Sequence, residues 1–194
     1  AASPTDPAGA RHLDGILEMI AQMGLSERVH WTARVSEEDA VAWIRCVDVI
    51  EKSCLLARPS VACLEWLDPL MGAGNWVPEL VELAGGRNLF GEPGKHTGRL
   101  KWEDLRAANP DFILALPCGF DLTRTRAEMA ALTQKPGWAD LKAVRKGRVF
   151  QCDGSAFFNR PGPRLVESLE ILAEILHPEK FQFGHEGRGW QRAA

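Results

Sequence analysis

The sequence predicts an α/β domain, a three-layer sandwich with a mostly parallel sheet, preceded by a long connecting helix. Short apolar runs typical of strands alternate with amphipathic segments typical of helices between residues 59 and 178. Such alternation requires crossover connections, which place helices on both faces of a parallel sheet. Apolar residues make up 45% of the 194-residue chain and charged residues 25%, which is ordinary globular composition. We therefore expect three parts: N-terminal helices over 1–58, an α/β lobe over 59–178 and a tail over 179–194.

The N-terminal part contains two helix starts. Asp6-Pro7 combines an N-cap carboxylate with proline at the first helical position. Ser36 begins a second helix with Asp39 three residues on, a variant of the capping box. An apolar stripe continues this helix to about Leu56. About 20 residues at 1.5 Å each predict a rod of roughly 30 Å.

Three apolar runs are the expected parallel strands of the lobe, namely Val61–Leu64, Phe112–Leu116 and Arg148–Cys152. A fourth, short strand is predicted at Arg87–Phe90. The segment Glu65–Asn75 contains a proline and two glycines, and this composition predicts a loop.

The predicted helices lie between and after these runs. One begins at Trp76-Val77-Pro78 and ends at a glycine pair, and a short one follows Pro136-Gly137 and ends at Gly147 after a last turn rich in cations. The others are Leu100–Ala108, Thr123–Thr133 and a final helix from Pro163 to His177. From Lys180 to the end there are three glycines and no periodicity, which predicts a loose tail.

The composition of the chain disfavours some classes of binding partner. The formal net charge of −3 does not favour nucleic acid, and no apolar run approaches the roughly 20 residues of a membrane span. The five cysteines are odd in number and lack metal-finger spacing, so we expect reduced, buried thiols. Reduced thiols leave a cytoplasmic location open.

Three loops are predicted to leave strand ends: Glu65–Asn75, Pro117–Leu122 and Asp153–Arg160. Ligands of open parallel sheets bind outside the carboxyl ends of the strands. Large aromatic side chains in such loops either pack onto the core or form a platform for a ligand, and the sequence leaves both interpretations open. The candidate ligand-binding residues are Trp66, Asn75, Trp76, Cys118, Gly119, Phe120, Phe157, Phe158 and Arg160.

The sequence does not favour an enzyme. Cys118 follows a strand, but a nucleophilic cysteine needs a nearby base, and His96 and His177 have no evident link to it. No phosphate-binding or nucleophile-elbow motif occurs. Acidic residues in the three loops are candidates for a metal site, yet each also suits a turn or an N-cap: Asp68, Asp121 and Asp153.

Four segments in order carry a family resemblance: LEWLDPLMGAGNWVPELVELAGG, LPCGFDL, WADLKAVRKGRVF and GSAFFNRPGPRLVE. Together they resemble the C-terminal lobe of the periplasmic substrate-binding proteins that serve cobalamin and iron-chelate ABC importers. The resemblance implies a helical-backbone metal-chelate-receptor fold, in which one long helix joins two lobes and the ligand lies between them. Residues 36–56 would be that helix, and the N-terminal lobe of the family has no counterpart before it.

The resemblance also implies a function. The chain would be the substrate-binding component of an importer for cobalamin or a related iron chelate, binding without catalysis, with an ABC permease as partner and a periplasmic location. The chelate would be a ligand, and no cofactor is expected. Trp66 and Trp76 would flank the chelate, with Phe157 facing it. Asn159 stands where family members present an acidic residue to the permease.

Two further hypotheses stay open beside this one. The lobe would serve as a protein-interaction module, or, as a third hypothesis, as a hydrolase using Cys118. If the strand-end aromatic residues face solvent, they would expose on the order of several hundred Å² and favour a homodimer through this face. Otherwise the loops that carry them would fold inward.

Overall fold

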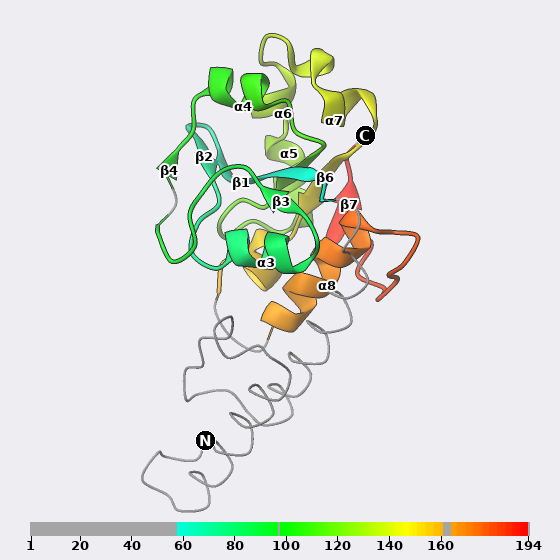
Figure 1. The fold of residues 1–194 in the computed structure, drawn as a ribbon. Helices are drawn as coiled ribbons and strands as arrows, with labels where there is room; N and C mark the ends of the chain where they lie inside the picture. The colour runs from blue at the N-terminus through cyan, green and yellow to red at the C-terminus, as the bar shows by residue number, and fades with distance from the viewer. Residues whose placement is uncertain (1–57, 97, 161–163, 194) are drawn as a thin grey trace, which may run out of the picture.

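The structure is a computed structural model that describes residues 58–96, 98–160 and 164–193 (Figure 1). The predicted N-terminal helices, including the connecting helix, lie outside the described residues. None of the described helices combines the length and apolar character needed to cross a membrane.

The described chain is organised around one mixed sheet with the strand order β4-β2-β1-β5-β6-β7, in which β3 also pairs with β1. The four strands β1, β3, β5 and β6 pair in parallel, whereas β2 and β7 join the sheet antiparallel. The strands are β1 (Ser60–Leu67), β2 (Leu70–Gly72), β3 (Arg87–Asn88), β4 (Gly98–Arg99), β5 (Phe112–Ala115), β6 (Val149–Cys152) and β7 (Trp190–Arg192).

The parallel centre of the sheet confirms the predicted fold class. Val61 lies opposite Phe112 in the β1–β5 pair, and Ile113 lies opposite Val149 in the β5–β6 pair. Every residue of β5 and β6 is buried. A sheet covered on both faces explains why these strands are continuous apolar runs rather than alternating patterns.

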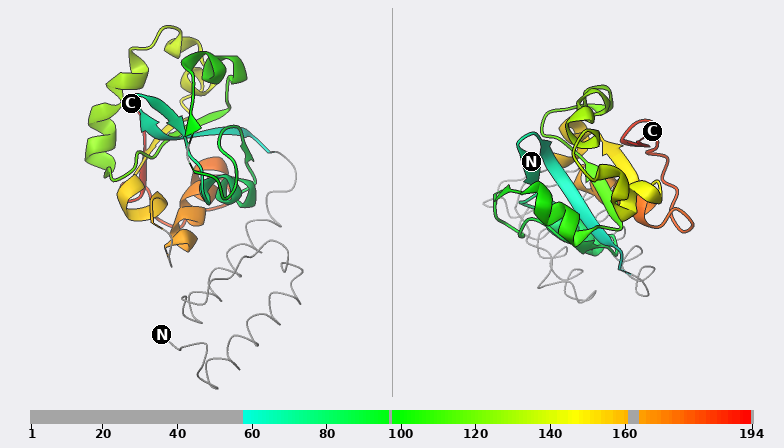
Figure 2. Two further views of the ribbon diagram at one scale, coloured as in Figure 1. Left: turned by 90° about the vertical axis from the view of Figure 1, so that its left-hand side faces the viewer. Right: turned by 90° about the horizontal axis from the view of Figure 1, so that it is seen from above.

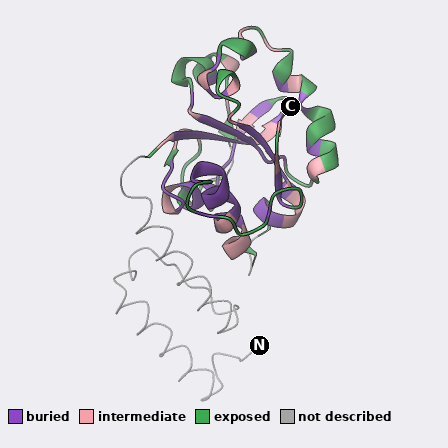
Figure 3. Ribbon diagram, turned by 90° about the vertical axis from the view of Figure 1, so that its right-hand side faces the viewer, coloured by how far each residue is buried: buried purple, intermediate pink, exposed green. Residues whose placement is uncertain are grey.

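Helices cover both faces of the sheet, and each face has its own core (Figures 1 and 2). One core contains α3 (Val77–Leu83) and α8 (Leu165–Leu176). The other contains residues of the remaining short helices, and buried residues dominate the sheet between them (Figure 3). These short helices are α4 (Trp102–Ala108), α6 (Ala130–Thr133), the 3₁₀ turn η1 (Trp138–Asp140) and α7 (Lys142–Arg145), while α5 (Leu122–Glu128) buries Thr125, whose hydroxyl donates to the Cys152 carbonyl.

The segment predicted as a loop at Glu65–Asn75 is largely strand. β1 continues to Leu67, and the chain returns as β2 in an antiparallel hairpin. Leu67 and Leu70 are buried in the second core, and this burial holds the hairpin against the sheet. The proline and glycines correctly predicted a turn in this segment, but the turn between Leu67 and Leu70 is much shorter than the predicted loop.

The prediction of a loose C-terminal tail is wrong. The last described residues form β7, which pairs antiparallel with β6. Trp190 is buried, its ring meets Phe150 edge-on at a centroid distance of 5.5 Å, and its Nε1 donates to Glu174 Oε2 at 2.8 Å. The segment contributes isolated buried side chains separated by glycines, so it shows no periodicity although it is part of the core.

A cluster of hydrogen bonds and one ion pair connects the amino ends of β1 and β5. Asp111 Oδ2 accepts hydrogen bonds from the Ser60 backbone N–H at 2.9 Å and from its hydroxyl at 2.7 Å, and Asp111 Oδ1 pairs with the Lys142 ammonium. Partial burial by itself raises the pKa of Asp111, but the hydrogen bonds from Lys142 and Ser60 outweigh it and lower the pKa to about 2.

Candidate functional site

Trp66 connects two of the predicted strand-end loops. It lies near the carboxyl end of β1, half-buried, and its Nε1 donates to the Asp68 carbonyl at 3.0 Å. Its ring packs on Phe120, from the loop after β5, at a centroid distance of 5.2 Å. The guanidinium of Arg124 covers the Phe120 ring at 3.8 Å, so Phe120 is buried, whereas Trp66 keeps an exposed part.

Trp76 connects the first loop with the loop after β6. Its Nε1 donates to the Phe158 carbonyl at 3.1 Å, and the side chain is half-buried against the first core. Phe157 and Phe158 are themselves 4% and 1% exposed and belong to that core. Their burial favours inward-packed aromatic residues over an open platform at this loop.

The loops after β5 and β6 are joined by hydrogen bonds. The Gly119 N–H donates to Asn159 Oδ1 at 3.1 Å, and the Ser155 N–H donates to the Phe120 carbonyl at 3.0 Å. A Cβ at Gly154 would lie 2.2 Å from the Pro117 carbonyl oxygen, so only glycine allows this approach. The residues Gly154–Phe158 form a single π-helical turn, η2, where a loop was predicted.

The remaining predicted residues of these loops show no catalytic arrangement. Cys118 is exposed and its N–H donates to the Glu65 carbonyl at 3.1 Å, while Arg160 is exposed at the end of the next loop. Asp121 and Asp153 accept hydrogen bonds from the N–H groups of Arg124 and Ala156 at 2.8 and 2.7 Å. These two carboxylates therefore act as caps of the turns that follow them.

Two other thiols, unlike that of Cys118, are buried and therefore unreactive. Cys63 and Cys152 are fully buried in the first core. Burial raises the pKa of the Cys63 thiol to about 12, and burial also raises the pKa of Cys152 well above its ordinary value. Both side chains remain protonated and serve as small apolar residues.

A fourth loop, after β3, belongs to the same edge and was not among the predicted site loops. The Asn75 N–H donates to the Lys95 carbonyl at 2.7 Å, and the Gly94 N–H donates to the Asn75 carbonyl at 2.8 Å. Gly91 has φ +86°, and a Cβ there would lie 1.8 Å from the Ala73 carbonyl oxygen. The sequence did contain an indication of this loop, since a predicted strand precedes a polar segment. The strand β3 is only two residues long, however, so the indication was weak.

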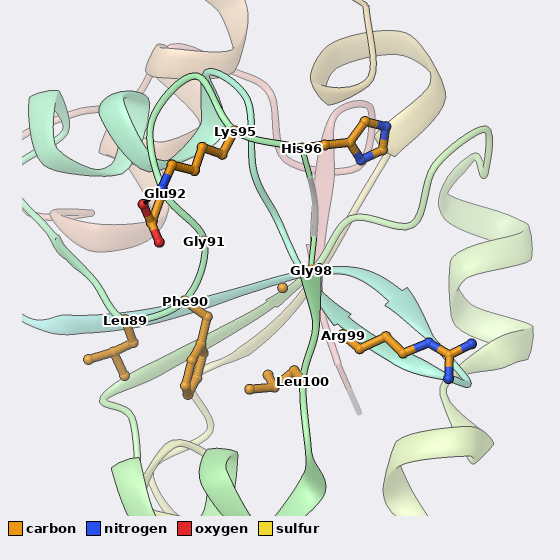
Figure 4. A pocket seen from close by; sticks show the side chains of 10 residues that line it. Leu89, Phe90, Gly91, Glu92, Lys95, His96, Gly98, Arg99 and Leu100 are labelled. Carbon is orange, nitrogen blue, oxygen red and sulfur yellow. Dashed lines mark ion pairs between the residues drawn. The ribbon is translucent and has the colours of Figure 1, made fainter.

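A pocket of about 400 Å³ lies between this loop and the β2 and β4 strands (Figure 4). Its apolar side chains are Leu89, Phe90 and Leu100. The side chains of Glu92 and Lys95 lie on the same side of the segment containing Gly98 as these three, whereas those of His96 and Arg99 extend on its other side. The glycines Gly72, Gly91 and Gly98 complete the lining. The lining therefore combines three apolar side chains with four charged or polar ones.

Comparison with known proteins identifies the family and relatives of similar fold. A family model described as periplasmic binding protein matches residues 57–156. This match covers more than half of the chain and includes the strands β1, β3, β5 and β6, the loops after the first three, and the start of the loop after β6.

Individual relatives are more distant. The uncharacterised ABC transporter substrate-binding lipoprotein YvrC of Bacillus subtilis is 27% identical over 113 residues, which are 57% of this chain and 32% of that protein. An ABC transporter substrate-binding protein of Listeria monocytogenes is 20% identical with a TM-score of 0.64, covering 87% of this chain and 64% of that one. IsdE of S. aureus, complexed with heme, is also 20% identical, with a TM-score of 0.62 over 84% of this chain and 63% of that one. The chain therefore spans less than two thirds of these proteins.

Proposed function

Since the chain belongs to the periplasmic binding protein family, we propose that it is a substrate-binding component of an ABC importer and binds a metal chelate. Cobalamin and haem are the ligands to test first. The resemblance of the four sequence segments supports cobalamin, and the similarity in fold to a protein complexed with heme supports haem. An extracytoplasmic location and an ABC permease as partner are part of the same proposal.

The convergence of four loops at the carboxyl edge of the sheet carries the proposal. They follow or adjoin β1, β3, β5 and β6, and hydrogen bonds between them hold the edge together. Open α/β sheets bind ligands at this edge. The half-buried rings of Trp66 and Trp76 offer apolar area at a low entropic cost, because each is already held by a hydrogen bond from its Nε1.

Binding without chemical conversion suits this edge. A nucleophilic cysteine requires a base within hydrogen-bond reach and a lowered pKa. The Cys118 backbone N–H donates to the Glu65 carbonyl, a bond that positions the backbone and does not involve the thiol. The rings of Trp66 and Trp76 at this edge are groups that hold a ligand by contact.

A fluorescence titration tests the proposal. Haem and cobalamin are each added to the whole chain, and tryptophan emission is corrected with free tryptophan for light absorbed by the chelate. We expect saturable quenching that becomes smaller in Trp66→Phe and in Trp76→Phe. Trp102→Phe is the matched control, because Trp102 stacks on Trp138 at 6.3 Å and donates to the Pro136 carbonyl outside the four loops.

The outcomes separate the proposal from its alternative. Saturable quenching lost from Trp66 and Trp76 but retained in the Trp102 variant supports chelate binding at the carboxyl edge. The absence of saturable quenching by both chelates would contradict the proposal and favour an interaction module. Dimerisation through this face remains a prediction, although the inward packing of Phe120, Phe157 and Phe158 removes much of the apolar area that would drive it.

A further inference from the structure

The turn between α7 and β6 is strongly basic. The seven residues that begin with Lys142 contain four cations and no carboxylate, whereas the whole chain has a formal net charge of −3. Lys142 is neutralised by its ion pair with Asp111. Arg145 and Lys146 are exposed and Arg148 is half-buried, and none of the three forms an ion pair within the part of the chain that the structure describes. The turn is therefore locally cationic on an anionic protein.

A fourth unpaired cation comes from the C-terminal segment. Arg192 is exposed, and its guanidinium donates a hydrogen bond to the carbonyl of Gly147, 45 positions earlier in the chain. Figure 1 shows the C-terminus beside α7, in agreement with this contact. Among the described residues Arg192 likewise makes no ion pair. Two distant segments thus place four cations around one turn, and we call them the basic turn: Arg145, Lys146, Arg148 and Arg192.

Aromatic rings hold two of these cations in place. The guanidinium carbon of Arg148 lies 4.9 Å from the ring centroid of Phe112, and that of Arg192 lies 5.0 Å from the ring centroid of Phe150. The two rings are themselves stacked, with a centroid distance of 6.1 Å. Guanidiniums that are ordered before binding lose less conformational entropy when they meet an anion.

The basic turn lies on an open part of the surface. Gly147 at its centre is exposed, and a Cβ there would meet only Arg192 Nη1, at 3.9 Å. A small anion is bound where several donors converge on one point of a concave surface. Cations spread over an open turn instead match negative charge that is itself spread over a surface. Phe183, the one large hydrophobic side chain exposed among the described residues, is not part of the basic turn, so the contact would be electrostatic.

We propose that the basic turn docks the protein on a lipid surface that carries anionic headgroups. This inference goes beyond the proposed function and does not depend on the binding of a chelate. Lipids diffuse within a bilayer, so anionic headgroups gather beneath the four cations, whereas a rigid polyanion would also approach the carboxylates of this anionic chain. Arg148 directly precedes β6, so the basic turn lies at the amino ends of the parallel strands. Docking there leaves the candidate site at the carboxyl ends free.

Sedimentation with sucrose-loaded vesicles tests the proposal on the whole chain, without a chelate. Vesicles of phosphatidylcholine alone are compared with vesicles that contain about one third phosphatidylglycerol. We expect binding to the anionic vesicles only, detectable at about 0.05 M salt and lost at about 0.5 M, because salt screens such contacts. The double variant Arg145→Gln/Lys146→Gln should lower the partition coefficient about 25-fold, since each Lys or Arg near an anionic surface contributes about fivefold.

The double variant Arg99→Gln/Arg126→Gln is the matched control. Both arginines are exposed and lie in β4 and α5, and their replacement lowers the net charge by the same amount. This variant should bind the anionic vesicles within about twofold of the wild type. Circular dichroism of each variant checks that the fold is retained.

Three outcomes would overturn the proposal. Equal losses in the two double variants would assign binding to the net charge of the chain rather than to the basic turn. Equal binding to neutral and anionic vesicles, or binding to neither, would mean that anionic headgroups are not recognised. Retention on heparin without binding to vesicles would identify a soluble polyanion as the partner instead. Because no chelate is present in this assay, each of these results leaves the proposed function intact.

Discussion

The Asp111 cluster at the amino ends of β1 and β5 and the loops at the carboxyl ends differ in how completely their polar groups are paired. At the amino ends, the Asp111 carboxylate accepts hydrogen bonds from Ser60 and forms an ion pair with Lys142. At the carboxyl ends, backbone groups are paired across loops, but two tryptophans remain half-buried and Arg99 has no partner among the described residues. The charges of the amino-end cluster are thus paired, whereas the carboxyl end, where we propose that the ligand binds, keeps half-buried rings and a guanidinium without a partner among the described residues.

The largest predicted effect concerns the C-terminal segment, which supports the carboxyl end. The Asp153 N–H donates to the Gly189 carbonyl at 2.9 Å, so the segment contacts the start of η2. Trp190→Ala should lower the free energy of unfolding by about 3–5 kcal/mol, because it empties a buried aromatic site and removes one of the hydrogen bonds that Glu174 accepts, leaving those from the Gly184 and His185 N–H groups. Denaturant unfolding measures this loss.

Phe183→Ala is the control for that change. Phe183 lies in the same segment but is 42% exposed, so its removal should cost less than about 1 kcal/mol. Equal, small losses in both variants would mean that the segment is a tail after all.

The second prediction concerns the contact between the ends of β5 and β6. Gly154→Ala places a methyl group against the Pro117 carbonyl and should cost about 3 kcal/mol, because backbone on both sides must move. Gly98→Ala is a suitable control, since a Cβ there has no neighbour within 4 Å and Gly98 has no positive φ. Thermal unfolding distinguishes the two, and an equally stable Gly154→Ala variant would contradict the described packing.

The smallest predicted effect is at the amino end. Asp111→Asn removes the ion pair with Lys142 and weakens the hydrogen bonds from Ser60. Because Lys142 is partly exposed, solvent screens the pair, and we expect a loss of about 1 kcal/mol at neutral pH. Asp104→Asn, at an exposed position in α4, should have no measurable effect.

The pH dependence of stability provides a separate test of this cluster. The pKa of Asp111 falls from 3.8 to about 2 in the folded protein, so the folded state binds the proton less tightly than the unfolded state does. The stabilisation is therefore present above pH 3.8 and is lost as the pH falls towards 2. Unfolding curves at pH 5, 4, 3 and 2 should show a smaller loss of stability in Asp111→Asn than in the wild type; parallel losses in the two proteins would argue against the cluster.

The central strands could be predicted from the sequence because strands that are buried on both faces of a sheet consist almost entirely of apolar residues. β5 and β6 are continuous apolar runs, and the parallel pairing follows from the helices between them. Periodicity was less informative for short helices. The predicted helix Thr123–Thr133 is divided into α5 and α6 at Met129, and the helix after Pro136-Gly137 is divided into η1 and α7 at Leu141.

The candidate site was predicted only in part, for two physical reasons. Burial of an aromatic residue depends on neighbours that are distant in the sequence, so the difference between half-buried Trp66 and buried Phe158 could not be seen in the chain alone. The loop after β3 was predicted as a polar loop but not as part of the site, because the pairing of β3 with β1, which fixes where this loop lies, cannot be inferred from so short a strand. Tertiary contacts determine the burial of the aromatic residues, and backbone pairing determines the position of the loop after β3. Neither produces a pattern in the local sequence.

The most direct test of the carboxyl edge as the binding face is a map of backbone amide resonances on addition of cobalamin or haem to the ¹⁵N-labelled chain. Chelate binding should shift or broaden the amide signals of Asn75, Lys95 and Gly119, which lie in three different loops of that edge. The amides of Asp111 and Lys142 at the opposite end should be unchanged. Perturbation of the amino-end amides with no change at Asn75, Lys95 and Gly119 would contradict the assignment of the binding face.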